Sequence, residues 1–139
     1  MCSGISQPEL TEPSAATPRG EIEGSAPPVV VVLADDLIWA TRLVDAVIAA
    51  GGKARKARRL EGLDAALATH AIVDLTARAY DGVGAVRELA GTGARVIAVG
   101  QHDDVSLRRA AMAAGAERVY TYRALFENGP RTIARWLAS

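Results

Sequence analysis

The chain has 139 residues, the size of one domain, and half of its residues are apolar, so a single core is expected. Sixteen basic and sixteen acidic side chains cancel, which excludes the strong positive field with which many proteins approach nucleic acid or an anionic membrane. One cysteine and two histidines far apart in the sequence exclude an internal disulfide and a structural zinc site.

The longest apolar stretch, residues 27–34, is much shorter than the roughly 20 residues that cross a bilayer. The first residues have neither a basic nor an apolar signal region, so Cys2 is not expected to carry a lipid anchor. A cytoplasmic protein without a membrane partner is therefore expected.

Residues 1–28 hold five of the six prolines and few large apolar side chains, which predicts a disordered N-terminal arm. The folded domain is expected at residues 29–139. The arm is acidic, because Glu9, Glu12, Glu21 and Glu23 stand against Arg19, which leaves a net charge of −3 on the arm and +3 on the domain. A solvated tail is the simpler interpretation, and contact with its own domain is the alternative.

Runs of apolar residues predict strands that alternate with helices after the arm. Val29–Ala34 is continuously apolar, which is typical of a strand covered on both faces. From Leu37 the apolar residues follow helical spacing (Leu37, Ala40, Leu43, Val44, Val47 and Ile48), and Gly51 and Gly52 mark the end of that helix. The remaining expected elements are an outer charged strand at 53–59, a short helix at 61–68, a strand at 71–75, a helix at 83–90, a strand at 95–99, a helix from Asp103 or Asp104 to Ala114, a strand at 118–121 and a last helix from Pro130 to Ala138.

This alternation predicts an α/β fold: a doubly wound, five-stranded parallel sheet in three layers, α/β/α. In such sheets a ligand crevice lies beyond the carboxyl ends of the strands. Asp35 and Asp36 follow the first predicted strand, and Asp74 lies near the end of the third. Three carboxylates that converge there favour a Mg²⁺ site. The alternative is that Asp36 only caps the following helix and Asp74 is a solvated strand end.

Together with Asp81-Gly82 and Ala114-Gly115-Ala116, these aspartates resemble the receiver domain of bacterial response regulators over residues 29–138. The resemblance implies a flavodoxin-like (CheY-like) fold. It implies that Asp36, Asp74 and the Thr76 carbonyl are ligands of Mg²⁺, that Asp35 is a supporting carboxylate, and that Asp74 accepts a phosphoryl group from a histidine kinase.

The sequence departs from the receiver pattern at four positions. Gly100 stands where the family has a Thr or Ser hydroxyl, and Tyr122 stands where it has a lysine. Arg78 replaces the usual proline, and Val119 replaces the aromatic switch residue. The resemblance is therefore to a degenerate receiver, or pseudo-receiver.

Helical phase predicts that Ile38 and Trp39 are at least partly exposed beside the acidic crevice, which suggests a contact surface for a partner. Partial cover by a neighbouring loop is the alternative. Trp136 follows core spacing and is expected to pack, whereas His70 and His102 are expected at the surface. The basic run at 53–59 is interpreted as protection of a sheet edge, with binding of nucleic acid or an acidic partner as the alternative.

The sequence as a whole predicts a stand-alone degenerate receiver that is not an enzyme and acts as a protein-interaction module in bacterial signal transduction. Its expected partners are proteins, among them a histidine kinase or a regulator, with a homodimer as a further option and no nucleic acid. Weak Mg²⁺ binding is expected. The alternative function is a single-domain response regulator that is phosphorylated on Asp74.

Overall fold

The computed structural model describes residues 26–61, 68–101 and 103–139. The predicted arm, up to residue 25, and most of the predicted short helix at 61–68 lie outside these ranges. The strands are β1 (Val29–Leu33), β2 (Lys53–Ala57), β3 (His70–Asp74), β4 (Arg95–Gly100) and β5 (Ala116–Thr121), and the helices are α1 (Leu37–Ala49), α2 (Gly82–Gly91), α3 (Val105–Ala114) and α4 (Tyr122–Ala138). None of the helices in the described ranges has the length and apolar character needed to cross a membrane.

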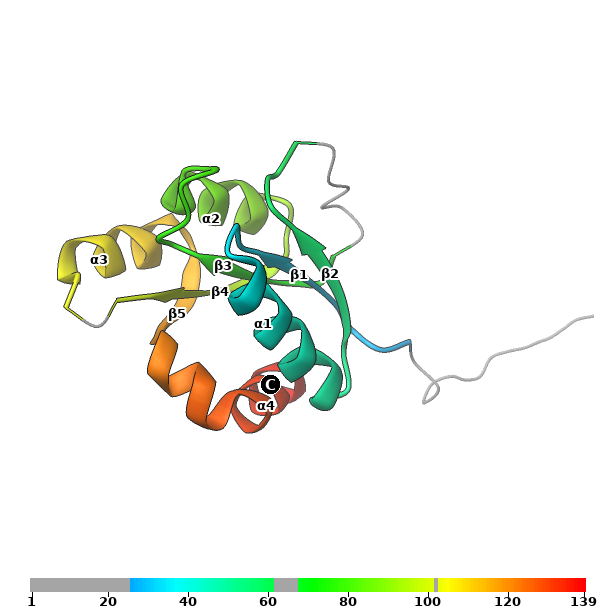
Figure 1. Cartoon of the computed structure of the whole chain (residues 1–139). Coiled ribbons are helices and arrows are strands. Elements are labelled where there is room, and N and C mark those ends of the chain that lie inside the picture. The colour runs from blue at the N-terminus through cyan, green and yellow to red at the C-terminus, as the bar shows by residue number, and fades with distance from the viewer. Residues whose placement is uncertain (1–25, 62–67, 102) are drawn as a thin grey trace, which may run out of the picture.

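The five strands form one parallel sheet in the order β2-β1-β3-β4-β5 (Figure 1). The chain moves from β1 outward to β2, then returns to the other side of β1 and continues to β5. The winding direction therefore changes between β1 and β3, which confirms the predicted doubly wound sheet. β2 is an edge strand, as its charged sequence indicated.

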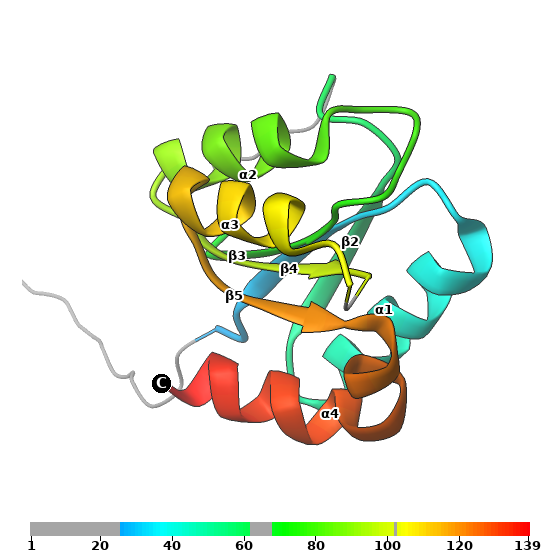
Figure 2. The same cartoon turned by 90° about the vertical axis from the view of Figure 1, so that its left-hand side faces the viewer.

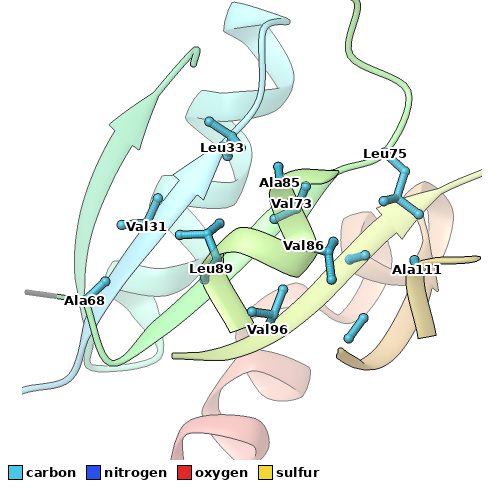
Figure 3. Packing of buried hydrophobic residues seen from close by; sticks show 13 residues of the cluster. Val31, Leu33, Ala68, Val73, Leu75, Ala85, Val86, Leu89, Val96 and Ala111 are labelled. Carbon is cyan, nitrogen blue, oxygen red and sulfur yellow. The ribbon is translucent and has the colours of Figure 1, made fainter. Parts of the chain in front are cut away.

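Helices cover both faces of the sheet, with α1 and α4 on one face and α2 and α3 on the other (Figure 2). Successive residues of a strand point to opposite faces, so Val31 and Leu33 pack toward α2 while Val30 and Val32 pack toward α1. Figure 3 shows the α2 side, where Val86 and Leu89 meet aliphatic side chains of the central strands. The core is thus mainly aliphatic, with Trp136 among its buried residues.

The α1 helix buries Ala40, Leu43, Ala46 and Val47. Leu37 and Ile48 were expected in the same apolar stripe, but they are 67% and 59% exposed. Ile48 lies ~100° around the helix from buried Val47. Leu37 lies in the first turn, at the end of the buried stripe.

The α4 helix begins at Tyr122 rather than at Pro130, so the predicted start was wrong. The Thr121 hydroxyl accepts a hydrogen bond from the Ala124 amide and caps this earlier start. The backbone leaves helical geometry at Asn128 (φ −133°, ψ 24°), two residues before Pro130. Because proline has no amide hydrogen to donate, Pro130 fits the first turn after this kink.

Candidate functional site

A pocket of about 420 Å³ lies at the carboxyl edge of the sheet, where the winding direction changes. It is lined by Asp35, Asp36, Trp39, Asp74, Thr76, Arg78, Gln101 and Tyr122. The structure therefore brings the three predicted aspartates to one pocket, at the place where doubly wound sheets bind ligands.

Asp74 ends β3 and is buried, with 3% of its surface exposed. Its Oδ1 atom accepts hydrogen bonds from the Thr76 amide and the Thr76 hydroxyl, both at 3.0 Å, and from the Tyr122 hydroxyl. The two hydroxyl groups are also in contact with each other. Asp74 is thus held inside the pocket by donors of its own chain, and the alternative of a solvated strand end is wrong.

Tyr122 is the first residue of α4 and is half-buried. Its ring meets the Trp39 ring edge to face, with 4.9 Å between the ring centroids. Burial, and then the hydrogen bond to Asp74, raise the pKa of the Tyr122 hydroxyl above its ordinary value. Tyr122 is therefore a neutral donor at the position where the receiver pattern has a cationic lysine.

Asp35 is turned toward the loop between β3 and α2. Its Oδ2 atom accepts hydrogen bonds from the backbone amides of Arg78, at 2.7 Å, and Ala79, at 3.0 Å. The hydrogen bond from the Arg78 amide is the main cause that holds the pKa of Asp35 below its ordinary value. A proline at position 78 could not make this bond, so the departure from the family pattern at Arg78 has a structural consequence.

Asp36 caps α1, because its Oδ1 atom accepts a hydrogen bond from the Trp39 amide at 3.0 Å. Such caps are worth about 0.5 to 2 kcal/mol. The capping that the alternative interpretation predicted for Asp36 is confirmed.

Tyr80 is a residue of this site that the sequence analysis missed. Its hydroxyl lies 2.7 Å from the Leu33 carbonyl oxygen and 2.8 Å from the Asp74 carbonyl oxygen, and so links the ends of β1 and β3. The loop folds closely at Gly82, where an added Cβ would come within 2.8 Å of the Leu75 backbone. An aromatic residue two positions before a glycine was the available sequence signal.

The aspartates do not fit a divalent ion in this arrangement. Asp35 accepts two backbone amides, Asp36 caps a helix, and Asp74 accepts three donors at one oxygen. Within the described ranges, no group of three or more His, Cys, Asp or Glu side chains is arranged to hold a metal. An ion could enter only if Asp74 exchanged some of its present contacts.

Gly100 ends β4 and is buried beside the pocket. A Cβ added at Gly100 would meet only the Leu75 side chain, at an ordinary contact distance of 3.5 Å. The position therefore has room for a first side-chain carbon, but glycine supplies no hydroxyl donor.

Ile38 and Trp39, the apolar pair predicted as a contact surface, lie in the first turn of α1. Ile38 is 72% exposed and follows exposed Leu37, which confirms the predicted exposure of Ile38. Trp39 is half-buried, and the ring that covers it is Tyr122 rather than a loop side chain.

Trp136 is buried, as its spacing predicted, but the expected surface position of His70 was wrong. His70 begins β3 and is only 8% exposed, with its ring edge to face on Trp136 at 4.8 Å. Its Nδ1 atom forms a hydrogen bond of 2.7 Å with the Thr69 hydroxyl. His102 lies outside the described residues.

Solved structures with the same fold are receiver domains. A response regulator receiver protein from Burkholderia phymatum is 26% identical with a TM-score of 0.62, and the match covers 80% of this chain and 95% of that one. A CheY-like receiver domain protein from Methanospirillum hungatei is 16% identical with a TM-score of 0.63, and the match covers 79% and 96%. No family model matches the chain, and no curated protein matches its sequence.

A third solved structure, a response regulator protein from Burkholderia pseudomallei, contains a phosphorylated aspartate, a calcium ion and citrate. It is 18% identical with a TM-score of 0.60, and the match covers 78% of this chain and 72% of that one. The chain thus has the CheY-like, flavodoxin-like fold of response regulator receiver domains, as the sequence resemblance implied.

Proposed function

We propose that this chain is a signalling module of the receiver type that acts through protein contacts, without enzymatic activity, and in which Asp74 is a poor phosphoacceptor. The observation that carries this proposal is the hydrogen bond from the Tyr122 hydroxyl to Asp74 Oδ1. That bond, with the two from Thr76, satisfies the oxygen within the chain itself.

The hydroxyl missing at Gly100 and the amine missing at Tyr122 would both have stabilised a phosphoryl group, so their absence supports the proposal that Asp74 is a poor phosphoacceptor. A hydrogen bond to a charged group contributes about 1.5 to 3 kcal/mol, and about 1.4 kcal/mol changes a rate tenfold. The neutral Tyr122 hydroxyl brings no positive charge to a developing phosphoryl group, and Gly100 brings no hydroxyl. Each loss is expected to lower the rate of phosphorylation by at least about tenfold.

The exposed Leu37 and Ile38 give this module a surface for a protein partner. They are 67% and 72% exposed and lie in sequence between Asp36 and Trp39, which line the acidic pocket, and large apolar side chains grouped in this way favour a contact surface. Trp39 connects this surface to the pocket, because it packs on Tyr122. A regulator protein, a histidine kinase or a second copy of the chain could bind here.

The second candidate function is a phosphorylatable single-domain response regulator. The position of Asp74, at the end of β3 in a pocket of about 420 Å³, favours it. In this function a kinase would transfer the phosphoryl group to Asp74, and the contact with Tyr122 would have to open first. Weak Mg²⁺ binding remains a prediction of both functions, but it requires Asp74 to exchange some of its present contacts first. Mn²⁺ relaxation measurements on wild type and Asp36→Ala would test it.

Intact mass after incubation with acetyl phosphate and Mg²⁺ separates the two functions. We expect wild type and Asp74→Ala each to give only its own unmodified mass, with no phosphoryl adduct. A stable phosphoryl adduct on much of the wild-type protein, absent in Asp74→Ala, would contradict the proposal and favour the second candidate.

A further inference from the structure

A groove of about 530 Å³ lies on the outer side of the sheet, between the end of α1 and the edge strand β2. It is lined by Val29, Ile48, Gly52, Lys53, Ala54 and Arg55. In the described part of the chain β2 pairs only with β1, so the other edge of β2 has no neighbouring strand. This groove is separate from the acidic pocket, which Asp35 and Asp74 line.

The groove combines an apolar interior with a basic rim. Ile48, Val29 and Ala54 supply aliphatic surface, and Ile48 is 59% exposed although it is large and apolar. Lys53 and Arg55 line the same groove, and the basic run continues along the strand and beyond it. The fitting occupant is an aliphatic side chain with an acidic residue on each side.

The chain itself carries such a sequence at Glu21-Ile22-Glu23. Ile22 is four residues before Ala26, where the described chain begins, and four extended residues reach about 14 Å. The entry to β1 lies beside the groove, because the Lys53 amide donates to the Pro28 carbonyl at 2.8 Å and Val29 is a lining residue.

We propose that residues 21–23 dock in this groove, with Ile22 against Ile48 and Ala54, and with Glu21 and Glu23 at Lys53 and Arg55. The contact is intramolecular, so the short connection gives a high effective concentration and a weak interaction suffices. Docking covers the open edge of β2, which otherwise is available to another strand. The net charge of −3 on the arm and +3 on the domain favours the contact at low ionic strength.

Amide NMR spectra of the full chain test this proposal. The test variant is Glu21→Lys with Glu23→Lys, and the control is Glu9→Lys with Glu12→Lys, which makes the same charge change farther along the arm. We expect the test variant to shift the Ile48, Gly52 and Lys53–Arg55 amides and the control to leave them in place. Adding Lys53→Glu and Arg55→Glu to the test variant should restore the docked state, as seen in the Ile22 amide.

Salt and dilution series on the wild-type protein need no variant. High salt should move the groove amides toward their positions in the test variant, and dilution should leave them unchanged. Equal shifts from test and control variants would overturn the proposal, because they would indicate a general charge effect. No shift from either pair would also overturn it, and so would shifts that disappear on dilution, since these would identify a second copy as the occupant.

Discussion

The Tyr122 hydroxyl donates a hydrogen bond to Oδ1 of Asp74, and so the first residue of α4 is tied to the last residue of β3. The two residues are 48 positions apart in the sequence, and Trp39 of α1 packs against the Tyr122 ring. Side chains of three elements thus meet in one pocket. In this arrangement Tyr122 lines the acidic pocket and its hydroxyl is bonded to Asp74.

Tyr122→Phe removes the hydroxyl and keeps the ring that packs on Trp39. We expect the free energy of unfolding to fall by about 1.5 to 3 kcal/mol, because a donor to a charged group is lost. Urea denaturation followed by tryptophan fluorescence measures this change. Tyr120→Phe on β5 serves as the control, and an equal effect of both variants would contradict a specific role for the Tyr122 hydroxyl.

Asp35→Ala should destabilise the loop between β3 and α2. The side chain accepts the Arg78 and Ala79 amides, and its loss leaves them without this partner, at a cost of about 1 to 3 kcal/mol. Asp35→Asn keeps one acceptor oxygen and should cost less. Hydrogen exchange at the Arg78 and Ala79 amides gives the local readout.

The lowered pKa of Asp35 also sets a pH dependence. Its contribution to stability is complete above the ordinary carboxyl value of about 3.9 and is lost as the pH falls through the lower folded pKa. In Asp35→Asn the free energy of unfolding should therefore fall less as the pH is lowered through the acid range. If Asp35→Asn loses as much free energy of unfolding at acid pH as wild type does, the Asp35 side chain does not cause this pH dependence.

Ile38→Asp should leave the free energy of unfolding within about 0.5 kcal/mol of wild type, because the side chain is 72% exposed. If Leu37 and Ile38 form the contact surface, the same variant should weaken self-association or capture of a partner. Met112→Asp on α3, also at an exposed apolar position, provides the control. Weakened association in both variants, or in neither, would count against this surface.

His70 predicts a second pH dependence, near neutrality. Burial is the main cause that lowers the pKa of His70, the positive charge of Arg95 adds to it, and Glu117 acts in the opposite direction. The neutral ring therefore stabilises the fold above about pH 6.5, and this contribution is lost as the pH falls toward the folded pKa. His70→Phe retains a ring against Trp136 and should remove the loss between pH 7 and 5. An unchanged pH profile in this variant would assign the dependence to another group.

The sheet could be predicted from the sequence because β1, β3 and β4 each contain a continuous apolar run between polar turns. The start of α4 was predicted wrongly, because Pro130 follows a kink inside a helix that already begins after Thr121. His70 was misassigned because its burial depends on Trp136, which is 66 residues away and packs on it only in the folded sheet.

The candidate site could be located from Asp35, Asp36 and Asp74, since the carboxyl ends of parallel strands meet at one edge. The bonds these side chains make could not be predicted. They depend on the path of residues 76–80, which brings the Arg78 amide to Asp35, and on the early start of α4, which brings Tyr122 to Asp74.

Restoring the hydroxyl at position 100 and the amine at position 122 tests whether their loss makes Asp74 a poor phosphoacceptor. Gly100→Thr, Tyr122→Lys and the double variant are incubated with acetyl phosphate and Mg²⁺ beside wild type, and the phosphorylated fraction is read from intact mass. We expect an unmodified wild type and a gain in the double variant that exceeds the sum of the single gains, because both groups would bind the same anion. Substantial modification of wild type at Asp74, or no modification of the correctly folded double variant, would contradict this expectation.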